Sequence, residues 1–244
     1  MALMACLLLL LVQSTAASLL SPKELVMQIY KQSPPPQIVI YLTGGGAKLF
    51  PWMLATPGAS KCVLEFKVPY SQKSMELLLN TRPRRFCGPD VARKMALAAY
   101  AQAQLLQSPT DDSEKPPCIG LGCTAALRSE RPRRGQHRCF IAVCTSQGLL
   151  EITLELAKNA RSRELEDEVV ARCALLGLAI ACDIAIENEQ EFWQLLPNER
   201  TEQQNGARAE QVALDIGEGE KGTRAAQFLS EEFRWHFSEH SEQI

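Results

Sequence analysis

Residues 37–46 read QIVIYLTGGG, and this stretch decides the fold class. The apolar and β-branched run at 37–42 predicts a buried strand, which ends at Thr43-Gly44-Gly45-Gly46. Residues 47–55 then predict a helix that Pro51 interrupts. A buried strand that leads through a glycine-rich turn into a helix is typical of an α/β domain.

The sequence on either side continues this pattern. Upstream, Ser21-Pro22-Lys23-Glu24 combines a capping serine, a first-turn proline and a capping-box glutamate, which predicts a helix to about Gln32. Downstream, Gln147-Gly148 predicts a hairpin turn between two antiparallel strands. We expect further strands at 61–68, 118–123, 138–144 and 149–156, and helices at 72–79, 90–107 and 161–186. The predicted fold class is therefore α/β, a layered sandwich with a mixed central sheet covered by helices.

Three regions are predicted along the 244 residues. Residues 21–190 form one domain. Residues 1–20 are apolar and resemble a secretory signal, because ACLLLLLV at 5–12 is followed by QSTAAS. No Lys or Arg precedes that run, so an apolar helix packed on the domain is the alternative. Residues 191–244 are predicted to be an acidic linker or tail that packs little apolar surface.

Charge and cysteine content narrow the classes of partner. The net charge of −2 gives no indication that the protein binds nucleic acid or an anionic membrane. No apolar segment after the N-terminus reaches the length of a membrane span. Nine cysteines occur without a CxxC pair and beside only three histidines, so no zinc site is expected. Reduced thiols favour a cytoplasmic location, whereas residues 1–20 favour secretion, so localisation stays open.

Three motifs then appear in a fixed order. The first is Thr43-Gly44-Gly45, followed by Thr56-Pro57-Gly58-Ala59-Ser60. The second is Val68-Pro69-Tyr70-Ser71, which precedes a helix with Val91-Ala92-Arg93-Lys94-Met95-Ala96. The third is Gly122-Cys123-Thr124-Ala125, which precedes a Phe-Ile-Ala-Val strand. Over roughly residues 21–186, this order and spacing resembles the CinA C-terminal, or nicotinamide-nucleotide amidase-like, family. The sequence looks closest to a eukaryotic branch in which this domain precedes a nucleotidylyltransferase-like domain.

The resemblance implies hydrolysis of the carboxamide of nicotinamide mononucleotide by a serine, a tyrosine, a lysine and a threonine. Tyr70, Ser71 and Thr124 match the family and are the implied catalytic residues, although Tyr70 can instead be a core-edge tyrosine. The serine position holds Tyr41 and the lysine position holds Met75. We therefore expect a weakened or inactive amidase. The alternative is a degenerate nucleotide-binding or interaction module attached to a nucleotidylyltransferase-type enzyme.

Two segments are candidates for binding the phosphate of a small-molecule nucleotide. Thr43, Gly44, Gly45 and Gly46 could cradle it through backbone N–H groups, or could form a tight turn without a ligand. A loop with Arg128, Arg131, Arg133, Arg134 and His137 could hold it by bidentate contacts, but a solvated surface loop is favoured. The loop lacks interleaved aromatic residues, so nucleic acid is not expected. No cofactor or metal is implied, and a homodimer is left open.

Overall fold

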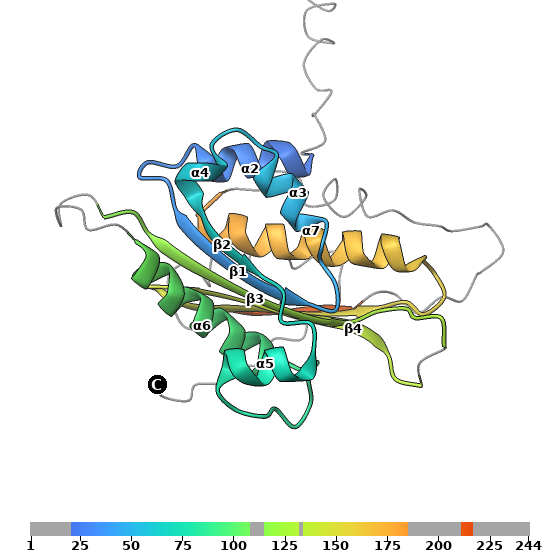
Figure 1. The fold of residues 1–244 in the computed structure, drawn as a ribbon. Coiled ribbons are helices and arrows are strands. Elements are labelled where there is room, and N and C mark those ends of the chain that lie inside the picture. The colour runs from blue at the N-terminus through green and yellow to red at the C-terminus, as the bar shows by residue number, and fades with distance from the viewer. Residues whose placement is uncertain (1–20, 108–114, 132–133, 185–210, 217–244) are drawn as a thin grey trace, which may run out of the picture.

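A mixed sheet forms the centre of the computed structural model, which describes residues 21–107, 115–131 and 134–184 and the backbone of 211–216 (Figure 1). The strand order is β2-β1-β3-β4-β5-β6. β1 is parallel to β2 and β3, and the remaining neighbours pair antiparallel. The strands are β1 (Gln37–Thr43), β2 (Val63–Lys67), β3 (Cys118–Ala126), β4 (His137–Thr145), β5 (Gly148–Leu156) and β6 (Gln211–Ile216). The predicted α/β sandwich with a mixed sheet is confirmed.

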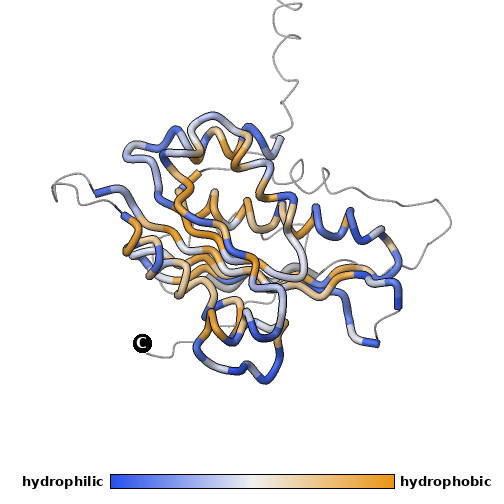
Figure 2. The backbone as a smooth tube through the Cα atoms, viewed as in Figure 1, coloured by the Kyte–Doolittle hydropathy of each residue, from blue (hydrophilic) through white to orange (hydrophobic). Residues whose placement is uncertain are grey.

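Helices cover both faces of this sheet (Figure 1). One face carries α2 (Pro22–Tyr30), α3 (Leu49–Leu54) and α7 (Arg163–Ala181), and the other carries α5 (Gln72–Leu79) and α6 (Pro89–Leu106). A short α4 (Ala59–Cys62) leads directly into β2. Figure 2 shows the apolar residues concentrated in the strands and on the helix sides that meet them.

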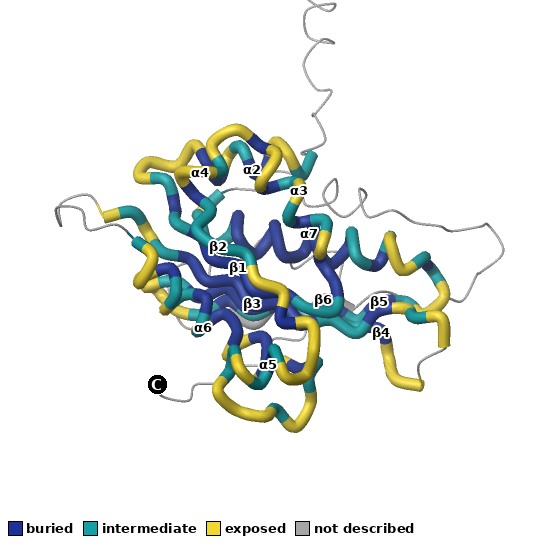
Figure 3. Tube along the Cα trace, in the orientation of Figure 1, coloured by how far each residue is buried: buried dark blue, intermediate teal, exposed yellow. Residues whose placement is uncertain are grey.

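Alternation along β1 divides the core into two layers, because successive strand residues point to opposite faces. Ile38 and Ile40 join the larger apolar cluster under α2, α3 and α7. Val39 and Tyr41 join a smaller cluster under α5 and α6. Figure 3 shows that both layers are buried, and the middle of α7 is buried on every side.

Glycines in β3 let α6 lie directly on the sheet. A Cβ added to Gly122 would stand 2.2 Å from the carbonyl oxygen of Ala92 in α6, and one added to Gly120 would stand 2.1 Å from the backbone nitrogen of Tyr100. These are backbone atoms, so rotating a side chain cannot relieve the overlap. Both glycines are therefore required by the close approach of helix and strand.

Gly122→Ala should therefore push α6 off the sheet and lower the free energy of unfolding by about 2 kcal/mol. Urea denaturation followed by circular dichroism measures the loss. Gly135→Ala is the matched control, because no atom lies within 4 Å of a Cβ placed there. Equal stabilities for the two variants would contradict this account of the packing.

Most predicted elements are confirmed, including the capping box of Ser21 and Glu24 and the antiparallel hairpin of β4 and β5. Some details differ. Residues 61–62 close α4 instead of opening β2, and α7 ends at Ala181. Pro51 lies in the first turn of α3, where its missing N–H costs no helical hydrogen bond, so it does not interrupt the helix.

The predicted tail contributes one strand that the sequence pattern did not suggest. Residues 211–216 form β6, which pairs antiparallel with β5 at the edge of the sheet. Residues 1–20, 191–210 and 217–244 lie outside the described residues, so the domain boundaries remain predictions. No helix in the described ranges combines the length and apolar character that a membrane crossing requires.

Candidate functional site

The segments that resemble the family meet at one edge of the sheet. Thr43 at the end of β1 is the Cα partner of Thr124 in β3, and Tyr41 pairs with Gly122 on one side and Lys67 on the other. Tyr70 and Ser71 follow β2, which ends at the same edge because it is parallel to β1. The carboxyl ends of parallel strands are where α/β domains usually bind ligands.

Tyr41 and Met75, at the positions of the family's serine and lysine, are core residues. Their exposures are 2% and 1%, and both belong to the apolar cluster that includes Val39, Val91 and Met95. Burial, together with the nearby carboxylate of Glu65, raises the pKa of the Tyr41 phenol well above its usual value. The Tyr41 phenol is therefore protonated at neutral pH, and the Met75 thioether has no proton to exchange.

The three matched residues contact the fold in different ways. The Ser71 hydroxyl caps α5 by accepting a hydrogen bond of 3.1 Å from the backbone N–H of Ser74. The Thr124 hydroxyl is buried and donates to the backbone carbonyl of Phe86 at 2.8 Å. Tyr70 is 71% exposed, so it is not a core-edge tyrosine. Two of the three hydroxyls thus hold neighbouring backbone in place.

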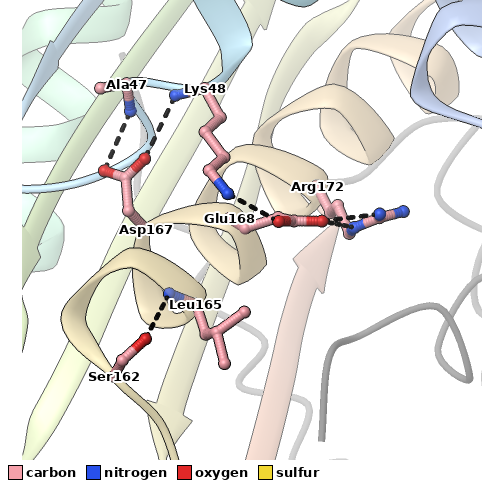
Figure 4. A network of polar contacts seen from close by, with 7 residues as sticks. All are labelled: Ala47, Lys48, Ser162, Leu165, Asp167, Glu168 and Arg172. Carbon is pink, nitrogen blue, oxygen red and sulfur yellow. Dashed lines mark hydrogen bonds and ion pairs between the residues drawn. The ribbon is translucent and has the colours of Figure 1, made fainter.

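The glycine run is a tight turn packed against β3. Gly44 has a φ of 81°, and a Cβ on it would overlap the carbonyl oxygen of Ala125. The two backbone N–H groups that follow the run donate to the carboxylate of Asp167 in α7, from Ala47 at 3.1 Å and from Lys48 at 3.2 Å (Figure 4). An internal carboxylate thus binds the first amides beyond the predicted phosphate cradle.

A charged network continues from Asp167 along α7 (Figure 4). Glu168 accepts from the ammonium of Lys48 at 2.8 Å and from the guanidinium of Arg172 at 2.8 Å. Burial of Glu168 raises its pKa, but the hydrogen bonds from Lys48 and Arg172 outweigh this effect and leave the pKa below its usual value. The network fastens α3 to α7 beside the glycine run.

The lowered pKa of Glu168 predicts a loss of stability in acid. A carboxyl whose pKa is lower in the folded state stabilises the fold above its ordinary pKa, and this contribution disappears as pH falls through the lowered value. Glu168→Gln should therefore be less stable than the wild type at pH 7, with the gap closing near pH 3. Urea denaturation at several pH values measures this gap, and Glu164→Gln, also in α7, controls for the lost charge. A gap that is constant with pH would contradict the prediction.

The predicted arginine loop is partly internal. His137 is buried as the first residue of β4, and its Nδ1 lies 2.6 Å from the buried carboxylate of Glu166. The other oxygen of Glu166 accepts from the backbone N–H of Arg128 at 2.6 Å. The expectation of a solvated loop is wrong for His137, which is buried, whereas Arg128 is exposed and is anchored to α7 through its backbone N–H. Arg133 lies outside the described residues.

The acidic residues of α7 were missed by sequence reasoning. Glu166, Asp167 and Glu168 lie within the helix predicted at 161–186, among the apolar residues Leu165, Val169 and Val170. The signal was present, since a carboxylate flanked by core positions needs a buried partner. What the sequence does not show is that the partners lie far away in the chain, at 47–48, 128 and 137.

Five of the described cysteines are buried residues of the apolar core: Cys62, Cys123, Cys139, Cys144 and Cys173. Burial raises the pKa of the Cys139 thiol well above its usual value, and raises those of Cys62 and Cys144 to about 11. Such thiols are poor nucleophiles. Within the described ranges, no group of three or more His, Cys, Asp or Glu side chains could hold a metal ion.

Comparison with known proteins finds similar folds among solved structures. No protein-family model and no curated protein sequence matches the chain. Among solved structures, the competence/damage-inducible protein CihA of Agrobacterium tumefaciens superposes with a TM-score of 0.52 at 16% identity, covering 66% of this chain and 95% of that one. A competence or damage-inducible protein of Enterobacter asburiae gives 0.50 at 14% identity, covering 67% and 97%. The chain has a CinA-like fold. At these identities the likeness establishes the fold of the CinA-like domain and leaves its chemistry to the residues described above.

Proposed function

We propose that this CinA-like domain has lost amide hydrolysis and serves as a nucleotide-binding module. The observation that carries the proposal is the packing of Tyr41 with Met75 in one buried apolar cluster. Hydrolysis of a carboxamide needs an activated nucleophile and a nearby group that can accept its proton. A buried phenol of raised pKa and a thioether supply neither.

Nucleotide binding is supported by the shape of the domain and by the resemblance to the amidase-like family. The ends of β1 and β3 meet at Thr43 and Thr124, at the edge of the sheet where ligands of α/β domains lie. Attachment to a nucleotidylyltransferase-type enzyme belongs to the proposal and rests on the sequence resemblance alone. A nucleotide-binding role does not need the serine and lysine that are missing.

An ammonia-release assay tests the loss of chemistry. Purified protein is incubated with nicotinamide mononucleotide, and a nicotinamide-nucleotide amidase serves as the positive control. We expect no ammonia above the blank from this chain. Ammonia release that disappears in Tyr70→Phe or Thr124→Val would overturn the proposal and restore the amidase assignment.

A thermal-shift series tests the retained binding. A ligand that binds only the folded state stabilises it by RT ln(1 + [L]/Kd), so a millimolar nucleotide with a Kd near 100 µM should add roughly 1.4 kcal/mol. We expect nicotinamide mononucleotide or a related mononucleotide to raise the melting temperature. If no nucleotide stabilises the protein, the nucleotide-binding role is wrong and a purely protein-interacting module remains.

A further inference from the structure

Two arginines beside the glycine run are fixed by carbonyl oxygens. Arg163, the first residue of α7, donates from Nη1 to the carbonyl of Arg128 at 2.8 Å and from Nη2 to the carbonyl of Gly44 at 3.3 Å. Arg128 donates from its own Nη1 to the carbonyl of Arg161 at 2.8 Å. These contacts connect the loops after β1 and β3 at the carboxyl edge of the sheet.

The positive charge of this pair is not neutralised by the residues that hold it. Carbonyl oxygens are neutral, and no ion pair joins Arg128 or Arg163 to a carboxylate within the described ranges. Glu166, which binds the backbone of Arg128, uses its two oxygens for His137 and for the amide of Arg128. The carboxylates next in sequence, Glu130 and Glu164, are exposed.

Both guanidinium groups have N–H donors that the described contacts do not use. A guanidinium has five N–H donors, of which the described contacts use two on Arg163 and one on Arg128. Both residues are exposed, so a solute can reach them. Because their side chains are already held in place, little rotamer freedom remains to be lost when an anion binds.

The end of the glycine run disfavours such an anion. The amides of Ala47 and Lys48 already donate to Asp167, and the carboxylate of Asp167 would repel a phosphate brought to the same position. A phosphate drawn to this edge of the sheet therefore meets cationic donors without carboxylate partners at Arg163 and Arg128, next to Gly44.

We propose that Arg128 and Arg163 bind the phosphate group of the nucleotide, in place of the backbone amides at the glycine run. The inference rests on the proposed function for the identity of the ligand, and on the contacts above for the position of its phosphate. Paired arginines suit a phosphate because the planar fork of each guanidinium matches two of its oxygens.

Calorimetric titration of the full chain tests the site. The probes are inorganic phosphate, nicotinamide mononucleotide and, as the phosphate-free control, nicotinamide riboside. Arg163→Gln and Arg163→Lys should weaken binding of both phosphate-bearing probes by about tenfold or more, and Arg128→Gln should do the same. Arg134→Gln is the matched control, since Arg134 is exposed in the same loop and only its carbonyl has a described contact. Melting temperatures without ligand establish that each variant is folded.

The outcomes separate this inference from the proposed function. Phosphate binding that needs Arg163, without any added affinity from a nucleoside, supports the site and counts against a nucleotide as its ligand. Nucleotide binding that is indifferent to both arginines overturns the site and leaves the proposed function standing. Equal losses of phosphate affinity in Arg134→Gln and Arg163→Gln would show that only the net charge of the region matters, and would overturn the site. Tighter phosphate binding in Asp167→Asn, with no dependence on Arg163, would show that the phosphate binds at the glycine run and would also overturn the site.

Discussion

The double substitution Tyr41→Ser with Met75→Lys is expected to unfold this domain instead of restoring an amidase. Removing the buried ring of Tyr41 leaves a cavity between β1 and α5, and losing a large buried side chain typically costs about 3–5 kcal/mol. A lysine at position 75 adds the penalty of an ammonium, or of a strongly shifted pKa, in an apolar cluster. Together these losses are comparable to the 5–15 kcal/mol by which typical domains are stable.

Guanidinium denaturation of the double variant and ammonia release from nicotinamide mononucleotide are the two measurements. Tyr41→Phe and Met75→Leu are the matched controls, because they keep the volume of the cluster and should cost less than about 1.5 kcal/mol each. We expect a loss of cooperative unfolding in the double variant and no ammonia. A folded double variant that releases ammonia would show that the two positions still belong to an active site and that their packing is dispensable.

The sequence pattern predicted the five strands from β1 to β5 because each carries a strong local signal. Residues 37–42 are β-branched, and the turn at Gln147-Gly148 gives the hairpin. The prediction of the first turn of α2 was correct for the same reason, since Ser21, Pro22 and Glu24 are close together in the sequence. β6 was missed because the surrounding Gln- and Glu-rich sequence has no comparable signal.

The candidate site was less accessible to sequence reasoning, because its contacts join distant segments. The resemblance implied that Thr43 and Thr124 lie at the ends of different strands, and the parallel pairing of β1 with β3 makes them Cα partners. It did not reveal that Asp167 binds the amides after the glycine run, across about 120 residues. A local sequence pattern shows that backbone N–H groups could bind an anion. Tertiary contacts decide whether those N–H groups already have an acceptor in the folded protein.

Glu166→Ala should be the most damaging single change among the acidic residues of α7. The carboxylate is fully buried and has a partner on each oxygen, His137 Nδ1 at 2.6 Å and the backbone N–H of Arg128 at 2.6 Å. Its removal leaves the buried imidazole of His137 and the backbone amide of Arg128 without this partner, in addition to a small cavity. Deleting one partner of such a buried pair typically costs about 3–5 kcal/mol.

The effect should also be specific to the pair and should extend to the phosphate site. Glu164→Ala, an exposed acidic residue in the same turn of α7, should change the free energy of unfolding by less than about 0.5 kcal/mol. A double-mutant cycle with His137→Ala should give a coupling of about 1 kcal/mol or more, because each single change leaves the other member of the pair without its partner. Since Glu166 anchors the amide of Arg128, Glu166→Gln should weaken phosphate binding while keeping the domain folded. Additive effects of Glu166 and His137, or an unchanged phosphate affinity in Glu166→Gln, would mean that the carboxylate fills space without positioning the loop after β3.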